Sequence, residues 1–258
     1  MDSTPLKTLS RSGKVTAKSM WVGSAVLCGC LVAGQALADC TPPAVSGDLD
    51  FSVCKEWPAY PGQTISAKAG FKPSADDGEG GTHGFYDLDL SVAQDGQSSP
   101  AATYDHASVY ESDGVALSDM SLDTARYTLT TDLRAFGVRA RFTNASRLNP
   151  LEEVQLSLYV REGATLRPVL QKLLVYQFSG EWDDDCTGQR SEMTRTVEVA
   201  KTRSHGYADL IVKTQQTGTT SAGKGEACKD SSTVYKPALT TLRYDGKSYV
   251  LPQGFKGL

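Results

Sequence analysis

Apolar and polar residues alternate along much of the chain. The apolar positions of YDLDLSV fall on one face: Tyr86, Leu88, Leu90 and Val92. FGVRARF (Phe136–Phe142) and EVQLSLYVR (Glu153–Arg161) have the same period, with apolar residues at every second position. Because successive side chains of a strand point to opposite faces, this pattern predicts half-buried β-strands. Helical spacing is scarce, so we predict an all-β, mostly antiparallel fold, arranged as a β-sandwich or a partial propeller.

Turn signals separate these expected strands. TLRYDGKSYVL (Thr241–Leu251) carries Asp245-Gly246 between two short runs, which predicts a closing β-hairpin. Two segments, Lys72–Thr82 and Thr214–Ser232, are rich in Gly, Ser and Thr and poor in apolar residues, so we predict loops there. Pro150, followed by two glutamates, favours a single helical turn.

A hexapeptide occurs twice, as HGFYDL (His83–Leu88) and HGYADL (His205–Leu210). Each copy follows a cysteine and precedes an Asp-Gly turn, which suggests two related β units, 39–146 and 147–258. A strand rises about 3.3 Å per residue, so the histidine and aspartate of one copy lie about 13 Å apart. That separation excludes joint metal binding or proton transfer within either copy.

We therefore interpret the hexapeptide as a strand entry used twice. Glycine supplies an unusual dihedral angle, aspartate accepts backbone N–H groups from a neighbouring loop, and leucine enters the core. An aromatic residue and the aspartate remain on the polar face of each strand. These four residues are candidate ligand contacts: Phe85, Asp87, Tyr207 and Asp209.

The N-terminal segment has the organisation of a secretory signal. Basic residues precede the apolar run WVGSAVLCGCLVAGQALA (Trp21–Ala38), whose ALA end matches a signal-peptidase site. We predict a signal peptide over 1–38 and an exported domain over 39–258, periplasmic or secreted, with no membrane span after cleavage. An uncleaved anchor and a lipoprotein modified at Cys30 are the alternatives.

Charge narrows the class of partner. The whole chain has a net charge of −4, and residues 39–258 carry 22 basic and 29 acidic residues, a net charge of −7. No basic stripe is present, which argues against nucleic acid and anionic lipid surfaces as partners. A basic protein partner suits this charge better.

The expected exported domain contains four cysteines: Cys40, Cys54, Cys186 and Cys228. An even number in an exported chain predicts two disulfides, with three possible pairings. Proximity in the sequence favours Cys40–Cys54 and Cys186–Cys228. A zinc site is the alternative, but these cysteines form no C-x-x-C pair and no histidine lies at finger spacing.

Acidic residues gather in two short segments, SADDGEGG and GEWDDDC. With Trp182, their acids are further candidate binding residues: Asp76, Asp77, Glu79, Glu181, Trp182, Asp183, Asp184 and Asp185. Calcium is the cation that such oxygen ligands suit. Calcium loops, however, space their acids alternately, and three consecutive aspartates of an extended segment cannot converge on one ion. We therefore predict no cofactor and no metal ligand, and an acidic solvated turn before Cys186.

Catalytic motifs are weak. The chain lacks G-x-S-x-G, and His106 stands apart from the two hexapeptides, so we assign no catalytic residue. Scattered carboxylates leave open an envelope hydrolase acting on peptidoglycan or polysaccharide. A purely structural envelope component is a third possibility.

Two segments carry a family resemblance. HGYADLIV (His205–Val212), followed by LRYDGKSYV (Leu242–Val250), resembles the F-G-x-x-D-L strands of FG-GAP, integrin-type β repeats. It is also similar to exported bacterial proteins of the I-type periplasmic lysozyme inhibitor kind. The resemblance implies a β-rich, disulfide-bonded protein that binds another protein without catalysis. The chain lacks the alternating calcium aspartates of FG-GAP repeats and the S-G-x-Y order of inhibitor loops. From sequence, we predict a periplasmic binding or inhibitor protein.

Overall fold

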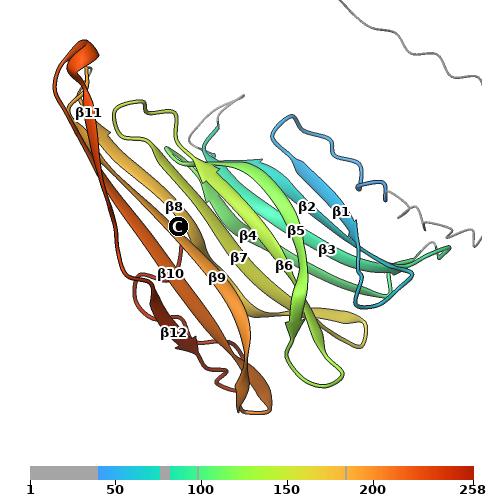
Figure 1. The fold of residues 1–258 in the computed structure, drawn as a ribbon. Helices are drawn as coiled ribbons and strands as arrows, with labels where there is room; N and C mark the ends of the chain where they lie inside the picture. The colour runs from blue at the N-terminus through green and yellow to red at the C-terminus, as the bar shows by residue number, and fades with distance from the viewer. Residues whose placement is uncertain (1–39, 76–81, 98, 184) are drawn as a thin grey trace, which may run out of the picture. The chain divides into compact units, whose positions relative to one another are not determined.

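The computed structural model describes residues 40–75, 82–97, 99–183 and 185–258 (Figure 1). The expected signal segment 1–38 lies outside them. The strands are β1 Phe51–Glu56, β2 Gln63–Pro73, β3 Gly84–Gln94, β4 Ala102–Ser112, β5 Ala116–Thr128, β6 Arg134–Thr143, β7 Leu151–Glu162, β8 Thr165–Trp182, β9 Gly188–Ser204, β10 Tyr207–Ala222, β11 Lys229–Val234 and β12 Ala238–Leu242. Within the described residues the helical structure is one 3₁₀ turn, Gly225–Ala227, and no helix is long and apolar enough to cross a membrane. The all-β prediction is confirmed.

The strands follow one another as antiparallel neighbours in two runs (Figure 1). The first run is β1-β2-β3-β4, and the second continues from β5 through β10. One parallel pair, Thr103 with Thr165, connects β4 to β8. At the far side β10 pairs with β9 on one edge and with β11 and β12 on the other. Hydrogen bonds thus link all strands, although two separate meanders make up the sheet.

The first core lies where β1–β4 face β5–β8, which gives the predicted sandwich arrangement. The alternating residues of β3 and β6 are buried there, as the sequence predicted: Tyr86, Leu88, Leu90, Val92, Phe136, Val138, Ala140 and Phe142. Phe136 lies between the rings of Trp57 and Tyr159, with centroids 5.2 and 5.8 Å away. Arg139, on the outer face of β6, is held by Asp123 of β5 at 2.6 Å.

β7 differs from its predicted half-buried pattern because both of its faces are covered. Leu156 and Leu158 belong to a second core, and Tyr159 belongs to the first. Gln155 and Ser157, on either side of Leu156 in the chain, are also buried. Alternation in the sequence identified the strand, but a second layer over the other face decided that its polar positions are buried as well.

The second core is closed by β10, β12 and the C-terminal segment. The Ala208 N–H of β10 donates to Leu129 O beyond β5 at 2.8 Å, so the ends of the second meander meet. The predicted closing hairpin is confirmed, because Asp245 N–H donates to Ser248 O at 3.0 Å. Tyr249 in that hairpin donates its hydroxyl to Ala208 O at 2.5 Å.

Three local expectations were wrong. Much of the loop expected over Thr214–Ser232 forms strands of β10 and β11, and Lys72 belongs to β2. Residues after Pro150 begin β7 instead of a helical turn. Composition misled in each case, because hydrogen bonds to neighbouring strands outweigh weak local preferences.

The suggested boundary between 39–146 and 147–258 falls between β6 and β7. These strands pair from Ala135 with Val160 to Thr143 with Glu152. Residues from 40 onward lie in one compact unit. Hydrogen bonds therefore cross the suggested boundary.

Candidate binding surface at the β8–β11 arm

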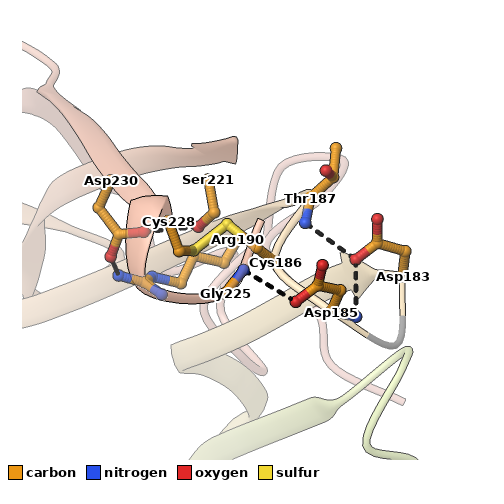
Figure 2. The surroundings of a disulfide bond; sticks show 9 residues. All are labelled: Asp183, Asp185, Cys186, Thr187, Arg190, Ser221, Gly225, Cys228 and Asp230. Atoms are coloured by element: carbon orange, nitrogen blue, oxygen red, sulfur yellow. Dashed lines mark hydrogen bonds and ion pairs between the residues drawn. A yellow bond between two sulfur atoms is a disulfide. The ribbon is translucent and has the colours of Figure 1, made fainter. Parts of the chain in front are cut away.

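Both predicted disulfides are formed. Cys40–Cys54 joins the segment before β1 to that strand, with a Cα–Cα distance of 6.0 Å. Cys186–Cys228 joins the β8–β9 turn to the segment between β10 and β11, with a Cα–Cα distance of 5.8 Å (Figure 2). We call the paired region behind this second disulfide the arm; it comprises 176–182 of β8, 188–194 of β9, 217–222 of β10, and β11.

The acidic turn at the end of the arm is organised by its own backbone. Asp183 Oδ1 accepts the N–H groups of Asp185 at 3.0 Å and Thr187 at 2.9 Å, and these bonds lower the pKa of Asp183 (Figure 2). Asp185 Oδ1 accepts from Gly225 N–H at 3.3 Å, across the disulfide. The described acids of this turn are exposed. Asp184 lies outside the described residues.

Behind the turn, polar side chains on one face of the arm form hydrogen bonds and an ion pair with one another (Figure 2). Asp230 accepts from Ser221 Oγ and from Arg190, each at 2.6 Å, and both contacts lower the pKa of Asp230. Ser221 is buried by this arrangement. Thr219 Oγ1 lies 2.8 Å from Ser232 Oγ on the same face.

Trp182, a predicted binding residue, is partly buried against its own strand and β9. A Cβ added at Gly180 or Gly188 would overlap its ring, so these two glycines make room for the indole. Trp182 therefore supports the β8–β9 hairpin. Glu181 is exposed on the opposite face.

The outer edge of β10 carries the feature that sequence reasoning missed. Every residue of β11 is exposed, and in the described part of the chain this strand pairs with β10 alone. Val234, Tyr235 and Leu239 are 69%, 52% and 71% exposed. The sequence feature that could have indicated this edge is the apolar pair Val234-Tyr235 within an otherwise polar stretch.

The first hexapeptide supports a bulge in the following strand. Tyr86 pairs with Tyr110 and Leu88 with His106, so residues 107–109 of β4 lie opposite Asp87 alone. Asp87 Oδ1 accepts the N–H of Ser108 at 2.9 Å, which lowers the pKa of Asp87. The expected backbone acceptor role of this aspartate is confirmed. Phe85, beside it, is 39% exposed.

The second hexapeptide makes the same register shift against the preceding strand. Ala208 pairs with Arg203 and Leu210 with Val199, so residues 200–202 of β9 lie opposite Asp209 alone. Thr202 donates its hydroxyl to Asp209 at 2.7 Å. Asp209 is only 4% exposed, which corrects its expected place on an exposed polar face. The bulge of β9 covers it.

The other positions of the two copies differ more. His205 and Gly206 have φ angles of +49° and +87°, typical of a two-residue hairpin turn, so the predicted glycine dihedral is confirmed there. Gly84 instead allows close backbone approach, because a Cβ would overlap Lys72 O. Tyr207 stacks on Tyr244 with centroids 4.3 Å apart, and so serves the fold.

In the first copy the bulged strand, β4, follows the hexapeptide in the chain, whereas in the second copy the bulged strand, β9, precedes it. The two copies therefore occupy different topological positions. Each nevertheless places an aspartate against three residues of a neighbouring strand. The repeated motif is therefore a shared structural device.

The remaining candidates are three acids before β3. Asp76, Asp77 and Glu79 lie outside the described residues. Among the residues that are described, no group of three or more His, Cys, Asp or Glu side chains is placed to hold a metal ion.

Comparison with known proteins returned no relative. No protein-family model, no curated protein and no solved structure matches this chain.

Proposed function

We propose that this chain is an exported protein that binds a basic protein partner through the tip and outer edge of the arm. The observation that carries the proposal is β11, an exposed strand with one free edge, which the Cys186–Cys228 disulfide ties beside the acidic turn. A free edge offers backbone donors and acceptors to an extended segment of another chain.

The exposed acidic side chains at the tip of the arm, near the Cys186–Cys228 disulfide, determine which kind of protein the arm attracts. Glu181, Asp183, Asp185 and Glu226 are exposed, and none of them forms an ion pair within the described residues. Acidic side chains around an open strand edge favour a basic segment and speed its association at low ionic strength. Val234 and Tyr235 supply the apolar contacts that slow dissociation.

Two formed disulfides support an oxidising compartment such as the periplasm. The resemblance to lysozyme inhibitors supports a strongly basic enzyme as the partner class. A lysozyme is therefore the first probe.

Binding of a basic lysozyme to the full chain, measured by biolayer interferometry, tests the proposal. We expect saturable binding at low salt that weakens as salt is added. The Glu181→Gln/Glu226→Gln variant should associate about 3-fold more slowly at low salt, and Val234→Ala/Tyr235→Ala should dissociate about 10-fold faster. Glu198→Gln, which removes an exposed acid of β9 outside the arm, is the matched control. Absence of binding at low salt, or equal binding by all variants, would contradict the proposal.

A further inference from the structure

A shallow groove crosses β8–β11, mainly on the face of the arm opposite the Arg190–Asp230 pair, although Arg190 and Thr219 also belong to its lining. It encloses a volume of about 530 Å³ and runs over the paired strands from Ser179–Glu181 to Ser231–Tyr235. Hydroxyl and amide side chains dominate its lining. Glu181 contributes a carboxylate, Arg190 a guanidinium and Tyr235 an aromatic ring.

Strand register explains why these side chains share one face. Directly paired residues of neighbouring antiparallel strands point to the same side of a sheet. One row across the arm is Glu181, Gln189, Thr220 and Ser231. The next row is Ser179, Ser191, Gly218 and Thr233.

The two faces of the arm use their polar groups differently. On the Arg190–Asp230 face, side chains bond to one another, as described above. Among the described residues, the side chains of the two rows form one such bond, from Gln216 Nε2 to Ser191 Oγ at 3.1 Å. Side chains of Gln189, Thr220 and Thr233 have no protein partner among the described residues and point into the groove. Their hydrogen-bonding capacity is open to a ligand.

The floor of the groove is formed where a side chain is missing. Gly218 lies in the middle of the second row, and the Tyr235 hydroxyl lies 3.4 Å from the position of a Cβ on this glycine. Its backbone φ is not positive, so the glycine is not required by the strand conformation. A larger side chain here would press on the Tyr235 ring and change the floor of the groove.

We propose that this groove binds a neutral oligosaccharide. Three interstrand spacings give a width of about 14 Å, which suits two or three sugar rings. Sugar hydroxyls both donate and accept hydrogen bonds, as the serine, threonine and glutamine side chains do. The Glu181 carboxylate has the capacity to accept hydrogen bonds from two sugar hydroxyls. The Tyr235 ring supplies a face against which a sugar ring packs.

Other ligand classes fit less well. An apolar ligand would leave the lining hydroxyls and amides without partners, which is unfavourable. An anionic ligand would meet Glu181, while the guanidinium of Arg190, which also lines the groove, is engaged by Asp230. A peptide strand finds no free backbone over β9 and β10, because each of these strands is paired on both sides in the arm. The groove shares Glu181 and Tyr235 with the proposed protein-binding surface, but its proposed ligand is a sugar and does not depend on the protein partner.

Titration of the full chain with maltotetraose and with the N-acetylglucosamine tetrasaccharide, followed by NMR chemical shifts, tests the proposal. We expect saturable shifts in arm residues for at least one sugar, with a dissociation constant of about 1 mM or below. Gly218→Val, which changes the floor, and Tyr235→Ala should each weaken binding at least about 10-fold. Thr217→Val, one residue away on the opposite face, is the control and should change affinity less than about 2-fold.

Thermal unfolding of each variant shows whether the arm remains folded. No saturable binding of either sugar up to about 10 mM would overturn the proposal, as would affinity unchanged by Gly218→Val. Tetra-alanine binding with equal affinity would overturn it in favour of a peptide site. Lysozyme binding by Gly218→Val, measured in parallel, separates failure of this groove from failure of the β11 edge.

Discussion

The sandwich and the arm are both built from antiparallel strands, but different forces hold them. In the sandwich, β7 is buried on both faces and aromatic rings such as Phe136 fill the space between sheets. In the arm, Met193 is the buried apolar residue among those described, and a disulfide and polar pairs hold the strands. The comparison shows that one sheet can pass from a packed core to a solvated platform.

Because of this difference, the sandwich provides most of the stability, whereas the arm provides the groups that are free to contact a ligand. Burial of apolar area, at about 25 cal/mol per Å², stabilises the sandwich but leaves few groups free to contact a ligand. The arm buries little apolar area, so its hydroxyls, amides and acids stay exposed. The disulfide compensates by restricting the unfolded chain around the arm. Three experiments on stability test this division, in order of expected effect.

The largest effect is expected in the sandwich. Phe136→Ala removes a fully buried ring between Trp57 and Tyr159, and should lower the free energy of unfolding by about 3–5 kcal/mol. The exposed Thr233→Ala in the arm should change it by less than about 0.5 kcal/mol. Urea denaturation of both variants measures the contrast. Similar losses would show that the arm contributes to stability as the sandwich does.

The second comparison removes one disulfide at a time. Cys186 and Cys228 are 42 residues apart and Cys40 and Cys54 are 14 apart. Loop entropy then predicts losses of about 4 and 3 kcal/mol for the two double serine variants. Urea denaturation gives the global values, and hydrogen exchange reports the arm alone. If Cys186→Ser/Cys228→Ser leaves global stability unchanged while arm exchange rises, the arm unfolds separately.

The smallest of the three expected effects is the dependence of folding stability on pH. Burial raises the pKa of Asp123, but the Ala125 N–H and Arg139 lower it by more, so the folded pKa lies below its ordinary value. A lowered pKa stabilises the fold above the unfolded pKa of about 3.9, and this contribution is lost as pH falls through the folded value.

Asp123→Asn should therefore lower stability by about 1–2 kcal/mol at pH 7, and the gap to the unmodified chain should narrow below about pH 4. Asp230→Asn, at the exposed arm pair, should show a smaller gap with the same sign. Denaturation midpoints from pH 7 to about pH 2.5 measure both. A gap that widens on acidification would contradict the assigned contacts of Asp123.

Sequence patterns predicted the sandwich better than the arm. Strands with buried alternating residues, such as β3 and β6, were found because burial of one face requires that period. Within the arm, Thr214–Ser232 was predicted as a loop, because Thr, Ser and Gly give no apolar period. The candidate acids around Asp183 were found, but the groove around Gly218 was not, since it depends on which residues of four strands are paired.

By itself, the sequence determined the all-β class, the closing turn at Asp245-Gly246 and the disulfide pairings favoured by proximity. These features depend on local period, turn chemistry and chain separation. Tertiary structure alone decided that both faces of β7 are buried, that Asp209 is covered by a bulge, and that polar residues of four strands share one face. Each of these outcomes depends on strand register and layer packing between distant segments, which no local pattern encodes.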